Sequence, residues 1–247
     1  MRNRMRKQLF ILATSLFSLT FLSPAHAQTV HFTTEEYPPF SYRDGKTPVG
    51  ASTEQVQNVM AAIGVDYTIT VLPWVRAYNQ ALTDPMTCVF STAHNEERNR
   101  LFKWVQPLLI DRNILIKHSG SKVEAANLDE ARKYLVGTWR EDYTETILRG
   151  NNFPRIDVGS DFKASLKKLM SDRIDLMPIS ELYFDKLKEE GNAVEKVTVL
   201  SQQSLGIACQ KDFPADLLSR MQTALNALIA DGTQKRIFLK YGLHLGD

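Results

Sequence analysis

The sequence is constrained most by an alternation of strand-like and helix-like segments near its beginning. Ranges 30–33, 67–71 and 87–91 are typical of strands, and ranges 52–63 and 74–82 are typical of helices. A helix between two strands returns the chain to the same edge of a sheet, so the strands run parallel. The first part of the chain therefore predicts a doubly wound, parallel α/β layer.

The helix expected at 52–63 has a recognisable beginning and end. Four apolar residues of this segment fall on one face at helical spacing. Ser52 and Gln55 fit a capping box, in which two side chains satisfy free backbone N–H groups of the first turn. Gly64 then ends the helix.

A second alternation follows after Ile114. Its expected strands are 135–138, 155–158 and 174–177, and its expected helices are 143–148, 162–170 and 181–190. A pair of helices, which begin at Pro214 and Thr233, is expected near the end of the chain. The two alternations predict two α/β lobes, and no Gly/Ser-rich or Pro-rich linker separates them.

Residues 1–27 have the layout of an export signal. Residues 1–7 carry four basic side chains and no acid, residues 9–22 are apolar except for Thr and Ser, and Ala25-His26-Ala27 is a small-x-small triplet. This layout predicts a secretory signal peptide that is cleaved after Ala27. The alternative is an uncleaved anchor, but the apolar run of about 14 residues is shorter than the roughly 20 that span a membrane. Gln28 rather than Cys follows the cut, so no lipoprotein attachment site is expected.

The charge of the chain disfavours one class of partner. The net charge of +2 becomes −2 when the four basic residues of the signal are removed. A near-neutral protein lacks the broad positive field that nonspecific nucleic-acid binding requires. We therefore expect a soluble exported protein with no nucleic-acid partner.

Two cysteines, Cys88 and Cys209, lie in apolar, strand-like stretches. An oxidising compartment permits a disulfide between them, and the residues alone leave two buried free thiols as the alternative. Neither cysteine has zinc-type spacing or a neighbouring histidine that would make a nucleophilic pair.

The chain lacks the common signatures of catalysis. It contains no GxxxxGK[ST] phosphate loop, no G-x-S-x-G elbow and no H-E-x-x-H motif. No two of its five histidines have the spacing of metal ligands. We therefore expect no metal and no cofactor, and a binding protein is favoured over an enzyme.

A series of short motifs gives the chain a recognisable family likeness. Each motif is weak alone, but their order and spacing are more specific: 36–42 (Glu-Tyr-Pro-Pro-Phe-Ser-Tyr), 73–74 (Pro-Trp), 95–98 (Asn-Glu-Glu-Arg), 102–107 (Phe-Lys-Trp-Val-Gln-Pro), 173–176 (Arg-Ile-Asp-Leu), 205–208 (Leu-Gly-Ile-Ala) and 231–233 (Asp-Gly-Thr). Together they resemble the family 3 periplasmic solute-binding proteins, the polar amino-acid receptors of ABC transporters.

This resemblance implies an α/β, two-lobed periplasmic-binding-protein type II fold, with two doubly wound sheets joined by two crossing strands. The crossings are expected near 111–113 and 200–204. Lobe 1 would comprise 28–112 and 202–247, and lobe 2 would comprise 113–201. The Cys88 and Cys209 strands would be neighbours in lobe 1, which favours the disulfide.

The resemblance also implies how such a protein works. A small-molecule ligand, a carboxylate or an amino acid, is held between the lobes, which close by a hinge motion. A periplasmic monomer then delivers this ligand to an inner-membrane ABC permease.

By resemblance, Arg98 clamps the ligand carboxylate. A guanidinium suits this role because it forks two hydrogen bonds onto a planar carboxylate. The alternative is a surface arginine in a charged run. Further candidates for the site come from the aromatic loop, a strand end, a strand-to-helix loop and a helix start, and each has core packing or a solvated surface as its alternative. These residues are Tyr37, Phe40, Ser91, Trp139, Asp142, Tyr143, Trp74 and Arg76.

The chain departs from the family where an ammonium group would bind. Family members that bind α-amino acids carry an acid five residues after the aspartate that matches Asp175, and here that residue is Ser180, followed by Glu181. The acid that often precedes the aromatic loop is replaced by Thr34, and the threonine three residues before the arginine by Asn95. Either Glu181 binds the ammonium group or the ligand is not a standard α-amino acid. Asp175 itself is expected to be structural.

Two other functions stay open. The protein could bind a solute for sensing, without a transporter. It could also be a dehydratase that acts on cyclohexadienyl carboxylates, since periplasmic dehydratases are known on the same fold. In that case a pocket acid protonates a leaving hydroxyl, and the candidate acids are Glu141, Asp142 and Glu181.

Overall fold

The computed structural model describes residues 29–244, so the predicted signal peptide, 1–27, lies outside the described residues. Strand β1 (Val30–Thr34) pairs in parallel with β4 (Tyr67–Val71) and with β5 (Thr87–Ala93). Helices α1 (Ala51–Ile63) and α2 (Trp74–Thr83) connect them. The predicted β-α-β-α-β layer is confirmed.

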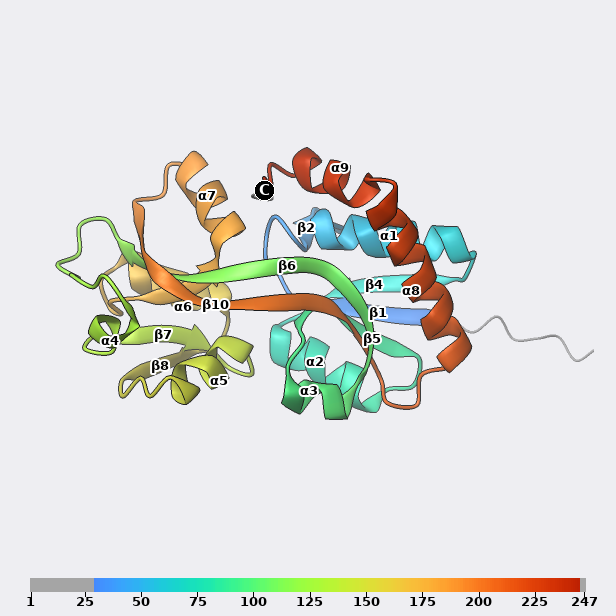
Figure 1. Ribbon diagram of the computed structural model, residues 1–247, viewed down its shortest axis with the longest axis horizontal. Helices are drawn as coiled ribbons and strands as arrows, with labels where there is room; N and C mark the ends of the chain where they lie inside the picture. The colour runs from blue at the N-terminus through green and yellow to red at the C-terminus, as the bar shows by residue number, and fades with distance from the viewer. Residues whose placement is uncertain (1–28, 245–247) are drawn as a thin grey trace, which may run out of the picture.

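Two long strands join the lobes. Strands β6 (Lys103–His118) and β10 (Val194–Cys209) have 16 residues each and pair antiparallel along almost their whole length. They run side by side from one lobe to the other (Figure 1). They complete a six-stranded sheet in the order β4-β1-β5-β10-β6-β9, whose last strand is β9 (Met177–Ser180). The fold is thus two-lobed, but one sheet continues through both lobes rather than ending at each crossing. The lobe boundaries at 112/113 and 201/202 stay a prediction.

Lobe 2 contains a small parallel pair, β7 (Val136–Trp139) and β8 (Ile156–Gly159). Its helices are α4 (Leu128–Ala131), α5 (Tyr143–Gly150), α6 (Phe162–Met170) and α7 (Glu181–Glu189).

The strand predicted at 174–177 is wrong in position, because β9 begins at Met177. Residues 175 and 176 instead donate their backbone N–H groups to the carbonyl of Leu135. The Asp175 carboxylate accepts from the backbone N–H of Leu135 at 2.7 Å, which is the expected structural role.

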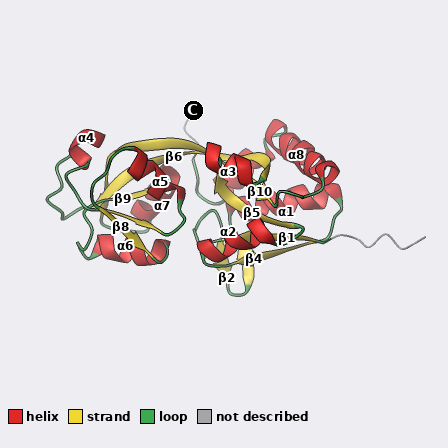
Figure 2. Cartoon of the chain, turned by 90° about the horizontal axis from the view of Figure 1, so that it is seen from below, coloured by secondary structure: helices red, strands yellow, loops and turns green. Residues whose placement is uncertain are grey.

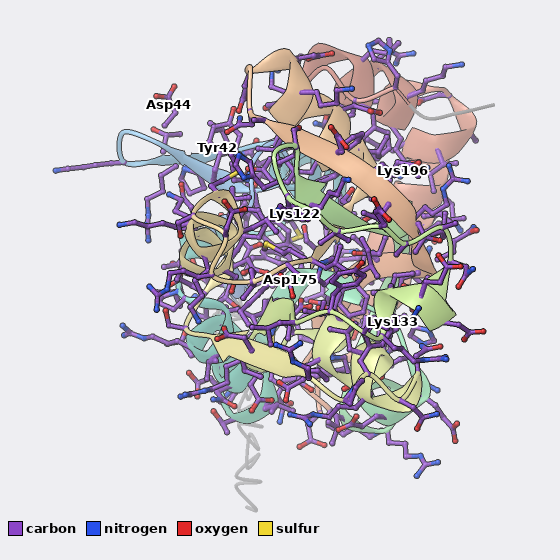
Figure 3. The ribbon with its side chains drawn as sticks, turned by 90° about the vertical axis from the view of Figure 1, so that its left-hand side faces the viewer. Tyr42, Asp44, Lys122, Lys133, Asp175 and Lys196 are labelled. Carbon is purple, nitrogen blue, oxygen red and sulfur yellow. A yellow bond between two sulfur atoms is a disulfide. The ribbon has the colours of Figure 1, made fainter. Side chains whose placement is uncertain are left out.

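Lobe 1 is completed by α3 (Glu96–Leu101), α8 (Ala215–Ala230) and α9 (Thr233–Lys240). Helices α8 and α9 pack beside α1 (Figure 1). The hairpin of β2 (Tyr42–Asp44) and β3 (Thr47–Val49) projects from this lobe (Figures 2 and 3).

The predicted capping box at the start of α1 is wrong. The helix begins one residue earlier than expected, at Ala51, so Ser52 lies inside it and the amide of Gln55 donates to the carbonyl of Ala51. Gly50 precedes the helix with a φ of 122°, in the region that favours glycine. A Cβ at Gly50 would lie 2.4 Å from the carbonyl oxygen of Phe40. The helix start is therefore shaped by close packing against the aromatic loop.

A disulfide links β5 and β10 in lobe 1. Cys88 and Cys209 lie opposite each other in these antiparallel strands, are fully buried, and are bonded. The alternative of two free thiols is therefore wrong. No helix among residues 29–244 is both long enough and apolar enough to cross a membrane.

Candidate functional site

A cavity lies where the two lobes meet the connecting strands. Most of the candidate residues line it, from both lobes: Tyr37, Phe40, Trp74, Ser91, Arg98, Trp139, Asp142 and Tyr143. The structure adds further lining residues that the sequence analysis did not select: Glu35, Ala93, Asp111, Asn113, Thr144 and Leu205. Arg76, Ser180 and Glu181 do not line it.

Arg98 is held firmly at one wall of the cavity. It lies in α3, where the side chain of Asn95 caps the helix by accepting from the backbone N–H of Arg98 at 2.8 Å. The Arg98 side chain is buried, and its guanidinium lies 5.5 Å and 5.2 Å from the ring centroids of Trp74 and Tyr78. Among the described residues that line the cavity, Arg98 is the only base.

The guanidinium keeps donors free for a ligand. Nη1 donates to the carbonyl of Ala93 at 3.4 Å, and Nη2 donates to the carbonyl of Glu141 at 2.9 Å. A guanidinium has five N–H donors, so these two bonds leave others for a carboxylate. The burial of Arg98 is inconsistent with the alternative of a surface arginine.

One carbonyl of lobe 2 receives two donors from lobe 1. Besides Arg98, the indole Nε1 of Trp74 donates to the carbonyl of Glu141 at 2.8 Å. Glu141 has a φ of 61°, in the left-handed region. We call these two hydrogen bonds the carbonyl seam.

Arg76, two residues after Trp74, is exposed and lies outside the cavity.

An aromatic cluster centred on Tyr37 forms another wall of the cavity. The ring of Tyr37 stacks on Phe40, with centroids 5.6 Å apart. It also packs against Trp139, Phe162 and Tyr183 of lobe 2, at 6.4, 4.7 and 5.1 Å. We call the contacts of Tyr37 with these three lobe 2 rings the aromatic seam. The Tyr37 hydroxyl also accepts from the backbone N–H of Ser180 at 3.1 Å.

Three carboxyl groups line the cavity, and burial raises the pKa of each. Burial raises the pKa of Asp111 to about 7, against hydrogen bonds from the Ser180 hydroxyl and the Arg112 backbone. Burial also raises the pKa of Asp142, although Thr144 donates to this carboxylate. The pKa of Glu35 is raised well above its usual range by burial and by the nearby charge of Asp142.

The sequence analysis missed Glu35 and Asp111. Glu35 directly follows Thr34, the position at which an acid was expected, but Thr34 is buried and donates to Ser41 at 3.0 Å. Asp111 interrupts an apolar run in β6 at a predicted crossing. An acid in such a run was the available signal.

The two residues proposed for the ammonium side lie behind or outside the cavity. Ser180 is buried, and its hydroxyl donates to Oδ1 of Asp111 at 2.7 Å. Glu181 forms ion pairs with Arg112 and Lys196. Although partial burial acts to raise the pKa of Glu181, hydrogen bonds from these two bases outweigh it and the pKa is lowered. Glu181 was one of two alternatives for the ammonium side, and its ion pairs and its place outside the cavity disfavour it.

Ser91 combines a left-handed backbone conformation with a buried hydroxyl group. It lines the cavity with a φ of 58°, and its buried hydroxyl has no hydrogen-bond partner among residues 29–244. A ligand with a polar group would supply that partner. Residues 29–244 hold no cluster of three or more His, Cys, Asp or Glu side chains that could bind a metal ion.

A two-lobed fold around a buried cavity with a guanidinium at its wall defines a solute-binding protein. The model of the bacterial extracellular solute-binding proteins, family 3, matches residues 30–244, and the chain belongs to this family. No curated protein matches the sequence significantly.

Several solved structures share the fold. An ancestral arginine-binding protein bound to arginine is 20% identical, with a TM-score of 0.78 over 87% of this chain and 99% of that chain. A histidine kinase sensor domain with similarity to periplasmic binding proteins is 18% identical, with a TM-score of 0.79 over 87% and 96%. An ancestral amino-acid-binding protein, a precursor of cyclohexadienyl dehydratase, is 17% identical, with a TM-score of 0.76 over 86% and 94%.

Proposed function

We propose that this protein captures a small polar carboxylate, with an amino acid favoured, between its lobes and delivers it to an inner-membrane ABC permease. The observation that carries the proposal is Arg98. It is a buried base with free donors, at the wall of a cavity that also holds carboxyl groups. A guanidinium and a carboxylate at one site suit the two charged ends of an amino acid.

The cavity walls favour a small ligand that is shielded from water. Phe40 and Trp139 are almost completely buried and present apolar surface. Excluding water strengthens the ion pairs that the ligand makes inside the cavity. The free hydroxyl of Ser91 supplies a polar contact.

Closure of the lobes depends on contacts that the ligand would share. Arg98 donates to Glu141 of the other lobe while it lines the cavity. A ligand that contacts both lobes stabilises the closed arrangement, because it binds that state more tightly than the open one. Export by the signal peptide at 1–27 would place this binding in the periplasm, beside the permease.

The first experiment is a thermal-shift screen of residues 28–247, unfolded and refolded without reductant so that carried-over ligand is lost. The panel contains amino acids, other small carboxylates, oligopeptides and sugars. A ligand at 100 times its Kd adds roughly 2.7 kcal/mol to the free energy of unfolding. We expect a clear shift with at least one carboxylate.

Isothermal titration with the ligand found then tests Arg98. We expect Arg98→Ala to weaken binding by roughly 30-fold or more, because the ligand carboxylate loses its charged partner. Arg76→Ala is the matched control, since it removes the same charge from an exposed position outside the cavity. Equal Kd values for Arg98→Ala and the unaltered protein would contradict the carboxylate clamp.

A dehydratase is the second candidate function. Burial raises the pKa of all three cavity carboxyl groups, that of Asp111 to about 7, and a raised pKa favours the protonated form that a general acid requires. Of the three acids considered from sequence, Asp142 lines the cavity, whereas Glu141 and Glu181 do not. Turnover of prephenate or arogenate by the pure protein would establish this function, and its absence would leave binding.

A sensing role without a transporter differs in its partner. The histidine kinase sensor domain shares the fold, so the fold permits either outcome. Ligand uptake by cells that lack only this protein decides between them. Loss of uptake supports the permease partner.

A further inference from the structure

Ser180, which stands where many relatives carry an acid, lies beside a different acid, Asp111. By the family resemblance, that position carries the acid of members that bind α-amino acids. Here the Ser180 hydroxyl donates to Oδ1 of Asp111 at 2.7 Å. Ser180 does not line the cavity, whereas Asp111 does. The carboxyl group therefore reaches the same neighbourhood from a different strand.

We propose that Asp111 binds the ammonium group of the ligand, so that β6 supplies the acid which relatives supply from position 180. This inference rests on the proposed function, because it needs a ligand that carries an amine. It assigns to a residue of the connecting strand a role that the sequence pattern placed in lobe 2.

The other acids are less suited to this role. Asp142 caps α5, and its Oδ1 already accepts from the backbone and hydroxyl of Thr144. Glu181 is paired with two surface bases. Glu35 lies near Arg98, whose positive charge acts on its carboxyl group, and it also lines a neighbouring groove with Arg43 and Lys163. Asp111 is almost completely buried, and no base among residues 29–244 forms a salt bridge with it.

The surroundings of Asp111 suit an ammonium group. Burial raises the pKa of the Tyr37 and Tyr143 hydroxyl groups, and the nearby charge of Asp111 raises both pKa values further. Both phenols are therefore neutral at pH 7 and offer oxygen acceptors. The amide of Asn113 donates to the Tyr143 hydroxyl and orients it. An ammonium group has three N–H donors, which a carboxylate and such oxygens can accept.

The charged groups that face Asp111 also define how it titrates. The Ser180 hydroxyl and the Arg112 backbone N–H stabilise its ionised form, and the negative charge of Glu181 opposes it. Burial outweighs the two hydrogen bonds, so a large share of Asp111 is protonated near pH 7. Binding of an ammonium group would then release that proton.

The test compares amino acids with their amine-free counterparts. The probe pairs are L-glutamate with 2-oxoglutarate, L-alanine with pyruvate, and L-phenylalanine with phenylpyruvate, each titrated into the refolded protein by calorimetry. We expect the unaltered protein to prefer the amino acid of at least one pair. Asp111→Asn should lower that preference by roughly 30-fold or more, because the ammonium loses its charged partner. The oxo acid should still bind through Arg98, which shows that the variant is folded.

Moving the acid back to position 180 is the sharper test. We expect Asp111→Asn combined with Ser180→Asp to regain at least about tenfold of the lost preference, since the carboxyl returns to the same neighbourhood. Glu181→Gln is the matched control, because it removes an acid beside Ser180 that lies outside the cavity. That variant should retain a preference for the amino acid, because the Asp111 carboxyl group is still present and ionises more readily without the charge of Glu181.

A measurement on the unaltered protein does not depend on any variant. Titrations at pH 6.5 in two buffers of different ionisation enthalpy should show release of up to about one proton on binding the amino acid and none on binding the oxo acid. An amino acid that binds without proton release, or with a preference that Asp111→Asn preserves, would overturn the role of Asp111 and leave the proposed function standing. If neither member of any pair binds and the wider carboxylate screen is silent, the proposed function fails and this inference fails with it.

Discussion

The two seams between the lobes differ in chemistry. The aromatic seam is made of buried rings, with Tyr37 of lobe 1 against Trp139, Phe162 and Tyr183 of lobe 2. The carbonyl seam consists of two donors on one carbonyl, that of Glu141. Ring contacts do not depend on the charge of a ligand, whereas Arg98 belongs both to the carbonyl seam and to the proposed ligand clamp. The aromatic seam therefore holds the lobes together by apolar contact, whereas the carbonyl seam would, with Arg98 as the proposed clamp, couple closure of the lobes to ligand binding.

The largest expected effect comes from the sheet that supports both seams. We expect the Cys88→Ala, Cys209→Ala double variant to lose about 4–5 kcal/mol of unfolding free energy, because the disulfide closes a loop with a sequence separation of 121. Urea unfolding of both proteins without reductant measures this loss.

Neither seam contains the disulfide, so ligand affinity should stay the same at temperatures where the variant is folded. A variant that keeps its stability but loses affinity would show that the bond positions the site rather than restraining the chain.

The second prediction concerns the pH dependence of the unfolding free energy that Asp111 contributes, which we expect to arise beside the aromatic seam and not at the carbonyl seam. The folded pKa of Asp111 is about 7, above its usual 3.8, so the folded protein holds an extra proton between these pH values. The stabilisation from this proton is complete below pH 3.8 and is lost as the pH rises through 7, up to about 4 kcal/mol. Asp111 adjoins the aromatic seam, because its partner Ser180 donates its backbone N–H to Tyr37.

Urea unfolding of the ligand-free protein from pH 4 to pH 8 tests this. Asp111→Asn should show a smaller drop in stability, because among the cavity carboxyl groups only Glu35 and Asp142 then keep raised pKa values, so the two curves should diverge with the variant more stable at pH 8. Parallel curves would mean that Asp111 ionises as readily in the folded chain as in the unfolded one.

The third prediction breaks the aromatic seam itself. Phe162 is 2% exposed, and its ring lies 4.7 Å from that of Tyr37. We expect Phe162→Ala to cost about 3 kcal/mol of unfolding free energy and to weaken ligand binding, because closure loses apolar contact. Phe153→Ala is the matched control, since Phe153 is buried in a separate core of lobe 2. It should be destabilised similarly without a change in Kd, and equal Kd effects in both variants would refute a specific role for the seam.

These seams also show how far sequence reasoning reached. Hydrophobic periodicity located the strands and helices of lobe 1, because local spacing reflects which face of an element is buried. It misplaced β9, because the two residues before the strand, 175 and 176, donate their backbone N–H groups to the distant Leu135. The family motifs located Arg98 and the aromatic loop.

Residues whose role depends on distant partners were not predictable in the same way. Glu181 follows the expected acid position, but its carboxylate forms ion pairs with Arg112 and Lys196. Arg112 lies 69 residues away in the sequence. Asp111 became recognisable only when the fold placed Ser180 beside it. Spacing along the chain carries no information about such pairings.

The smallest effect tests the carbonyl seam. Trp74→Phe keeps a ring beside Arg98 but removes the Nε1 donor to the carbonyl of Glu141. One neutral hydrogen bond contributes about 1 kcal/mol, so the Kd of the ligand should rise by roughly fivefold if this bond forms on closure. Trp104→Phe is the matched control, because the buried Nε1 of Trp104 has no hydrogen-bond partner among residues 29–244. Its Kd should not change. Equal affinities for the Trp74 and Trp104 variants would mean that the carbonyl seam forms equally with and without ligand, and closure would then depend on the aromatic seam and on Arg98 alone.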